Sequence, residues 1–158
     1  MKIDWKAWAP VELDGAKEAK TIFVGLCLAA AWGVFDFAAH YIDALNALYY
    51  NSGLTFRKLL IPGAVMEEFS SLILGCDTLF NLICLTMPLL AAYHYGIHCR
   101  SSMSIYLMRR LPDRWELHRR CLLIPLGGAA AAMAVLGLLG IVFYLIYILC
   151  TPAQCLPA

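Results

Sequence analysis

Residues 121–150 read CLLIPLGGAAAAMAVLGLLGIVFYLIYILC, and this stretch decides the fold class. It contains neither Lys nor Arg, and it is longer than the roughly 20 apolar residues that a helix needs to cross about 30 Å of hydrocarbon. Two further stretches, 21–45 and 69–98, also lack Lys and Arg. The sequence therefore predicts an all-α integral membrane protein with three transmembrane helices at 21–45, 69–98 and 121–150.

The composition agrees with a single membrane domain over residues 1–158. Hydrophobic residues make up 62% of the chain, which is more than a soluble domain of this size needs to fill one core. The first twenty residues are polar and mixed, whereas a cleavable signal peptide places an apolar stretch just after a basic start. We therefore expect the first span to remain in the mature protein.

The orientation follows from the basic residues, which gather in the second loop. Short loops rich in Lys and Arg stay in the cytoplasm. The segment 99–120 holds six arginines, namely Arg100, Arg109, Arg110, Arg114, Arg119 and Arg120. This predicts a multi-pass protein of the cell membrane with a cytoplasmic second loop, a cytoplasmic N-terminus and an extracytoplasmic C-terminus.

The N-terminal segment 1–20 and the third span each carry a feature of membrane packing. Trp5 and Trp8 alternate with charges, which predicts an interfacial helix broken at Pro10. This segment serves either as a membrane anchor or as a docking element. The third span has glycines and alanines three and four residues apart on its first half, a pattern that lets helices pack closely in lipid.

Polar residues within the first two spans form the first candidate site. Asp36, His40 and Asp43 are spaced four and three apart and share one helix face, and Asp77 and Asn81 repeat the spacing of four. Both sets fall at similar depth, and a charge in hydrocarbon is costly. The group can serve as a proton relay, a polar cavity for cargo or a weak metal site, or it can simply provide interhelical hydrogen bonds.

Two histidines near the end of the second span form another candidate. His94 and His98 are four residues apart, which suits either a metal site or an ordinary place at the membrane interface. A membrane metal or redox protein built on these histidines with Asp36, His40 and Asp77 stays open. Haem would need an axial partner at matching depth, and His40 lies at another depth.

Motifs of catalysis are absent from the sequence. It contains no Gly-rich phosphate loop, no Ser-His-Asp set and no zinc-ligand spacing. We therefore expect no enzyme activity, no catalytic residue and no cofactor or metal of the chain's own. The seven cysteines are too scattered for a disulfide framework, although a bridge between Cys150 and Cys155 is chemically possible.

The cytoplasmic loop is expected to form two short helices separated at Leu111-Pro112, because Pro suits the first turn of a helix. Asp113 and Glu116 would lie in that first turn, where negative charge favours the helix dipole. The simplest interpretation is a topology signal that also pairs with anionic lipid. That interpretation does not explain Trp115 beside the Pro turn.

The string 111–117, LPDRWEL, resembles the loop between the second and third spans of type-2 ATP-binding-cassette (ABC) transporter permeases. Permeases of that family typically carry a Leu-Pro-x-x-Arg-x-Glu-like pattern there. The resemblance implies that the loop is a coupling helix that docks on an ATPase subunit. It also matches the segment 2–20 to the family's connecting helix. The residues that it assigns to the partner contact are Arg109, Arg110, Pro112, Arg114, Trp115 and Glu116.

The resemblance leads to a functional hypothesis. Permeases of this family usually have six spans, so a three-span chain would be a half-sized subunit that needs further copies of itself or a companion permease. We expect a membrane subunit of an ABC exporter-like complex that uses ATP through its partner, contacts lipid and binds no nucleic acid. The alternative is a small regulatory or assembly protein that transports nothing and whose basic loop binds lipid or a partner.

Overall fold

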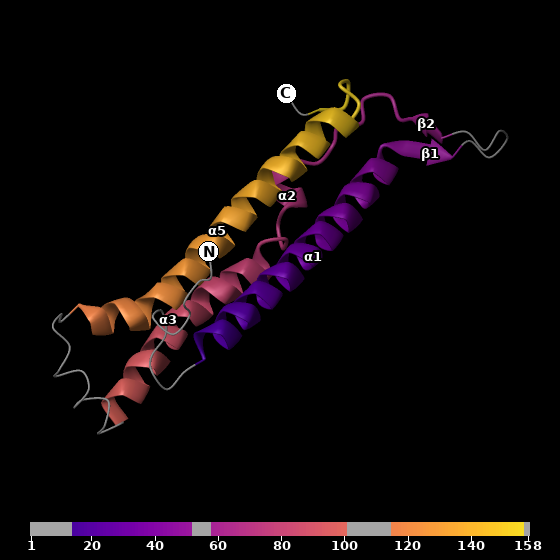
Figure 1. Ribbon diagram of the computed structural model, residues 1–158. Helices are drawn as coiled ribbons and strands as arrows, with labels where there is room; N and C mark the ends of the chain where they lie inside the picture. Colours follow the sequence, from indigo (N-terminus) through magenta and orange to yellow (C-terminus); the bar gives the residue numbers. More distant parts are fainter. Residues whose placement is uncertain (1–13, 52–57, 101–114, 157–158) are drawn as a thin grey trace. The chain divides into compact units, whose positions relative to one another are not determined.

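The structure is a computed structural model that describes residues 14–51, 58–100 and 115–156 (Figure 1). Three long helices dominate this part of the chain, α1 (Gly15–Ala47), α3 (Thr78–Arg100) and α5 (Glu116–Cys150). Each of them contains a stretch that is long and apolar enough to cross a membrane. This confirms the predicted fold class of an α-helical protein with three membrane-spanning helices.

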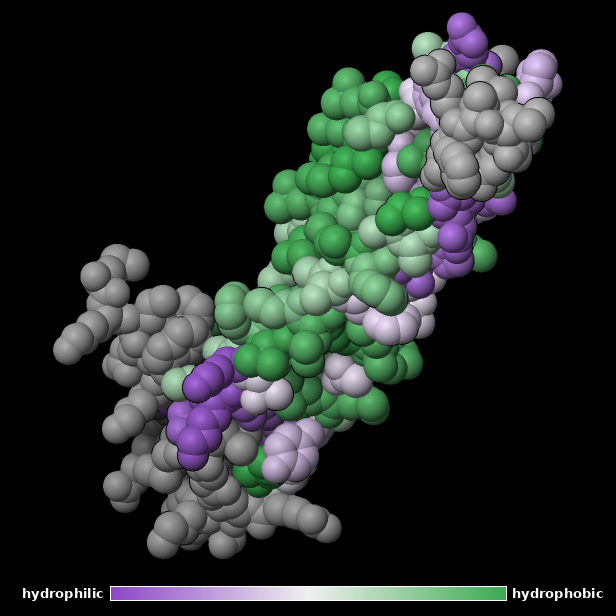
Figure 2. Space-filling view, turned by 90° about the vertical axis from the view of Figure 1, so that its right-hand side faces the viewer, coloured by the Kyte–Doolittle hydropathy of each residue, from purple (hydrophilic) through white to green (hydrophobic). Residues whose placement is uncertain are grey.

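The surface of the helices agrees with a lipid environment. Large hydrophobic side chains point outward along all three helices, among them Phe35 on α1, Leu89 on α3 and Leu138 on α5. Figure 2 shows that hydrophobic side chains cover most of the described surface on one face. Soluble proteins rarely expose apolar patches of this extent, whereas lipid tails solvate such side chains well.

The helix bounds differ from the predicted spans in informative ways. The predicted second span begins at about residue 69, but the structure has a four-residue helix α2 (Phe69–Leu72), a turn, and then α3 from Thr78. Helix α1 already begins at Gly15, so the last residues of the expected interfacial segment belong to it. Residues 1–13 and 101–114 lie outside the described residues, and so do most of the interfacial helix and of the coupling loop.

The chain forms two compact units, and α1 and α5 contribute to both. The first unit holds the chain up to Leu28 together with Phe80–Ala134. Its helices approach closely at Gly128, where an added Cβ would lie 3.1 Å from the Met87 sulfur and 3.3 Å from a methyl carbon of Ile22. Gly128 on α5 therefore sits against α1 and α3, as small residues do in membrane helix packing.

The second unit holds Ala29–Leu79 and Val135–Ala158, and it is built around an aromatic core. The rings of Phe37 on α1 and Phe143 on α5 are stacked with centroids 4.2 Å apart. Tyr41 stacks on Phe37 in turn, and its hydroxyl hydrogen-bonds with that of Thr151 at 3.2 Å. Aromatic pairs of this kind contribute about 0.5–1.5 kcal/mol beyond their buried area.

A two-stranded hairpin and the segment after it complete the second unit. Strand β1 (Tyr49–Asn51) pairs antiparallel with β2 (Lys58–Leu60). After the hairpin, the backbone N–H of Met66 donates to the carbonyl of Cys155 at 2.8 Å, and the Tyr147 hydroxyl donates to the carbonyl of Glu67 at 2.9 Å. These bonds attach the segment that leads into α2 to the end of α5.

Candidate functional site

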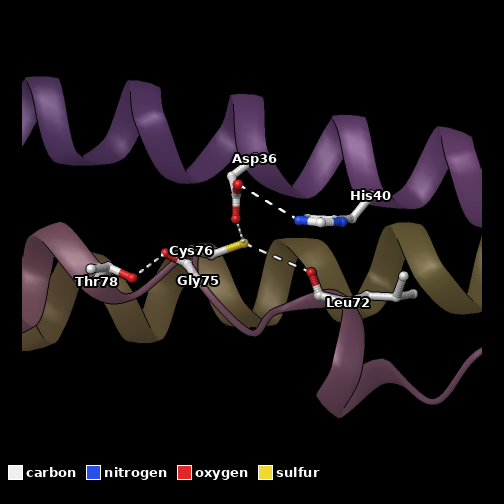
Figure 3. A network of polar contacts seen from close by, with 6 residues as sticks. All are labelled: Asp36, His40, Leu72, Gly75, Cys76 and Thr78. Carbon is white, nitrogen blue, oxygen red and sulfur yellow. Dashed lines mark hydrogen bonds and ion pairs between the residues drawn. The ribbon is translucent and has the colours of Figure 1, made fainter.

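The first candidate site, the Asp36 site, lies in the second unit where α1 faces the turn between α2 and α3. Figure 3 shows the carboxylate of Asp36 pointing from α1 toward this turn. The Cys76 thiol donates to Asp36 Oδ2 at 3.6 Å. On the other side, His40 Nε2 lies 3.8 Å from Asp36 Oδ1. The site thus consists of a carboxylate between an imidazole and a thiol.

Two glycines allow this close approach. Gly75 has φ +114°, a conformation that L side chains rarely adopt, and a Cβ there would lie 3.0 Å from Asp36 Oδ2. A Cβ at Gly33 would lie 3.1 Å from the carbonyl oxygen of Cys76. Thr78 then starts α3, and its hydroxyl donates to the carbonyl of Gly75 at 2.7 Å. The turn and α1 therefore approach closely because Gly33 and Gly75 have no side chains that would separate them.

Within the predicted polar group, the structure brings Asp36 and His40 together. The side chain of His40 is 56% exposed, whereas that of Asp36 is 21% exposed. Asp43 is exposed on the same face of α1, and Asp77 follows Cys76 in the turn. Asn81 belongs to the other unit. Cys76 was not identified as a site residue from the sequence, because its position beside Asp36 depends on the turn between α2 and α3.

The second candidate site, the Glu18 site, lies in the first unit and involves all three long helices. His94 on α3 is completely buried. Its Nδ1 lies 3.1 Å from the carbonyl oxygen of Cys121 on α5, and its Nε2 lies 3.1 Å from Glu18 Oε1 on α1. The other carboxylate oxygen, Glu18 Oε2, is buried without a hydrogen-bond partner among the described residues.

The partners of His94 fix where its protons are. A carbonyl oxygen only accepts, so Nδ1 must carry a hydrogen and donate it to Cys121. The contact between Nε2 and Glu18 then needs one more proton, held either by the imidazole or by the carboxyl group. The Glu18 site is therefore a proton-sharing contact that joins three helices. Both ring nitrogens of His94 have protein partners, which leaves neither for the metal that its spacing with His98 suggested.

The described ranges contain no candidate metal site. No group of three or more His, Cys, Asp or Glu side chains there is arranged to hold a metal ion. The groups present at both sites can form hydrogen bonds and can hold or pass a proton. Cys150 and Cys155 are free thiols, the first exposed and the second buried.

Of the residues predicted to contact the partner, the structure describes only Trp115 and Glu116, at the end of the loop. Arg109, Arg110, Pro112 and Arg114 lie outside the described residues. Trp115 is 73% exposed immediately before α5, and its carbonyl accepts a hydrogen bond from the backbone N–H of Arg119 at 2.9 Å. Glu116 is the first residue of α5. The end of the loop is thus continuous with the third spanning helix.

Comparison with models of protein families, with curated proteins and with solved structures finds no match to this chain.

Proposed function

We propose that this chain is a membrane-spanning subunit of an ABC exporter-like complex, in which the loop 104–120 docks on a separate ATPase. The proposal takes the identity of the partner from the resemblance of residues 111–117 to a coupling helix. In this arrangement the protein lies in the cell membrane, with its N-terminus and the docking loop in the cytoplasm and its C-terminus outside. The ATPase activity belongs to the partner.

The observation that carries the subunit role is the exposed polar face of α1. Asp36 and His40 lie roughly 5 Å and 11 Å from the middle of the span 21–45, at 1.5 Å per residue. His40 is more than half exposed there. An ionised Asp, Lys or Arg at the centre of a bilayer costs about 2.5–3.5 kcal/mol on insertion scales, and a neutral polar side chain that faces lipid still loses its hydrogen bonds with water. A neighbouring subunit that covers this face with polar groups offsets that cost, which supports assembly within the membrane.

The Glu18 site supports the coupling role. Cys121 lies near the start of α5, and its carbonyl holds His94 of α3, which in turn holds Glu18 of α1. A partner that displaces the first turns of α5 therefore acts on all three helices of the first unit together. Transmission by shifts of packed helices is a common form of conformational switching.

The test is co-purification of the tagged full-length chain from its native membranes. We expect an ABC ATPase to purify with it in a fixed ratio, and the triple variant Arg114→Ala, Trp115→Ala, Glu116→Ala to lose that ATPase. Trp32→Ala is the matched control, because it removes an exposed Trp from the middle of α1 and leaves the loop intact. Equal association of the triple variant and the wild type would overturn the proposal.

The salt dependence separates this proposal from a regulatory or assembly protein whose loop binds anionic lipid. Attraction between exposed charges weakens strongly between low and high ionic strength, whereas a packed helix in a groove is less sensitive. An ATPase that stays bound at high salt supports the coupling role. Purification without any ATPase, together with vesicle binding that salt abolishes, favours the regulatory role instead.

A further inference from the structure

The second unit contains a pocket beside the end of α5. Its volume is about 550 Å³, within the roughly 300–1,000 Å³ of pockets that bind small molecules. Three aromatic side chains shape it, Phe69 at the start of α2 with Tyr144 and Tyr147 on α5. The remaining lining residues are Glu68, Ser70, Ile148 and Leu156. The pocket therefore combines aromatic walls with one acidic side chain.

The three aromatic rings form a corner and not a parallel stack. The planes of Phe69 and Tyr144 are inclined by 70°, with ring centroids 5.2 Å apart. The planes of Phe69 and Tyr147 are inclined by 53°, with centroids 5.6 Å apart. Rings inclined in this way surround a ligand from more than one side, and the negative face of an aromatic ring attracts a cation. Aromatic cages are typical of sites for alkylated ammonium groups.

The fold holds two of the rings in place and leaves the third accessible. Tyr147 is buried, and its hydroxyl donates to the backbone carbonyl of Glu67. Phe69 packs against the core of the second unit. Tyr144 and the neighbouring Ile148, in contrast, are about half exposed. A ligand can therefore reach a preformed aromatic surface from outside the helices.

The carboxylate of Glu68 supplies the charge that complements a cation in this pocket. Its Oε2 accepts a hydrogen bond from the Ser70 hydroxyl at 3.3 Å. The ion pairs between described side chains do not include Glu68. Among the described residues that line the pocket there is no Lys, Arg or His. The negative charge beside the rings is thus available to a cation from outside the chain.

The position of the pocket along α5 brings it to the level of the lipid headgroups. Tyr147 and Tyr144 precede Cys150, the last residue of α5, by three and six residues, which is about 5 Å and 9 Å along the helix. Tyr is common at this depth, because its ring is apolar and its hydroxyl is polar. This preference explains the tyrosines but not the acid beside them, whereas a bound cation accounts for both.

We propose that the pocket formed by Glu68, Phe69 and Tyr144 binds an alkylated ammonium group, either that of a phosphocholine headgroup or that of a free organic cation. The rings contact the methyl groups of the ligand, and the carboxylate neutralises its charge. A primary ammonium fits this pocket less well, because it is compact, strongly hydrated and has three N–H donors to satisfy. The inference is independent of the ATPase partner, because it concerns only the second unit.

The first test is binding of choline to the purified full-length chain in micelles of an uncharged detergent, measured by isothermal titration calorimetry. The control ligand is the uncharged isostere of choline in which a carbon atom replaces the nitrogen. We expect choline to bind at least about tenfold more tightly than this isostere, because only choline gains the attraction of the rings and the carboxylate. Equal binding of the two ligands would overturn the proposal.

Matched variants test the two parts of the pocket separately. Tyr144→Leu removes the ring of a half-exposed residue and keeps apolar volume, so the fold should be retained and the affinity for choline should fall about fivefold. Tyr144→Phe keeps the ring and should bind as the wild type does. Glu68→Gln should lower the affinity about two- to fivefold. Glu67→Gln removes the same charge from a residue outside the pocket and should leave the affinity unchanged.

Native mass spectrometry identifies the source of the ammonium group. Dioleoyl phosphatidylcholine and dioleoyl phosphatidylglycerol share their acyl chains, and only the first carries an alkylated ammonium. Selective retention of phosphatidylcholine, lost in Tyr144→Leu, assigns the pocket to a lipid headgroup, and choline binding without such retention assigns it to a free cation. A chain that binds neither choline nor phosphatidylcholine selectively, unchanged binding in Tyr144→Leu, or equal effects of Glu67→Gln and Glu68→Gln would each contradict the proposal.

Discussion

The imidazole of His94 has no contact with solvent, so its two hydrogen bonds must satisfy both ring nitrogens within the protein. Nδ1 donates to the carbonyl of Cys121, and Nε2 shares a proton with Glu18. A buried polar group that loses its partner costs about 1–3 kcal/mol, because it gave up water when the protein folded. The carboxyl group of Glu18 is therefore needed for stability, whatever its part in function.

Replacing Glu18 by Ala should lower the free energy of unfolding by about 1–3 kcal/mol, since Nε2 of His94 then has no partner. Glu18→Gln should cost much less, because an amide N–H can donate to the neutral imidazole. The measurement is unfolding of the purified protein in detergent micelles. Lys17→Ala is the control, since it removes an exposed ion pair with Asp14 and keeps the residue that precedes α1, and such pairs contribute little. Equal stabilities of Glu18→Ala and Lys17→Ala would contradict the assignment.

For individual residues, the sequence predicts contacts within one helix better than contacts between helices. The spacing of four between Asp36 and His40 predicts their shared face, and the structure places their side chains together. Their role stays a prediction. Glu18 and His94 are far apart in the chain, and no periodic pattern relates an acid in the first turn of one helix to a histidine near the end of another. A buried contact of this kind depends on how the helices pack.

Among the elements, the break between α2 and α3 is the feature that a pattern of hydrophobic residues does not reveal. In the sequence, residues 69–98 form one largely apolar run. A helix and a tight turn can have the same apolar composition, so this pattern does not distinguish between them. The break includes Gly75, whose positive φ cannot occur within a continuous helix, and Asp36 occupies the space where a side chain at residue 75 would stand. The sequence Gly-Cys-Asp-Thr at 75–78 is a weak local signal, and it marks a turn here because of the contact with α1.

The fit between α1 and this turn can be tested with two glycines of the same helix. Gly33→Ala places a methyl group 3.1 Å from the backbone carbonyl of Cys76, which cannot move aside like a side chain. We expect it to destabilise the protein by about 1–3 kcal/mol, as overpacking does. Gly25→Ala meets only Ile83 at 3.9 Å, and it should be neutral or stabilising by up to about 1 kcal/mol. The readout is thermal unfolding in micelles, and a Gly33→Ala variant as stable as Gly25→Ala would show that the approach is looser than described.

For the molecule as a whole, the number of spanning helices was predictable because it depends on the length and composition of single segments. Each of α1, α3 and α5 contains such a segment. The two compact units, in contrast, are assembled from segments distant in the chain, and their cores depend on contacts such as that between Phe37 and Phe143. Such pairings need the three-dimensional arrangement, and so does the recognition that His40 is exposed on a spanning helix.

The exposed polar face of α1 leads to a prediction about assembly. If a neighbouring subunit covers His40, then His40→Leu should weaken association, because lipid tails solvate Leu as well as a partner does while the polar contact is lost. Hydrogen bonds between membrane helices contribute about 0.6–2 kcal/mol, so we expect dissociation constants roughly three- to thirty-fold higher. Single-molecule photobleaching in liposomes at several lipid-to-protein ratios measures this. Phe35→Leu changes a neighbouring exposed apolar side chain and should leave association unchanged. A wild-type chain that associates at every ratio with neither a second copy nor a companion membrane subunit would show that this face contacts lipid or water, and the subunit role would lose its main support.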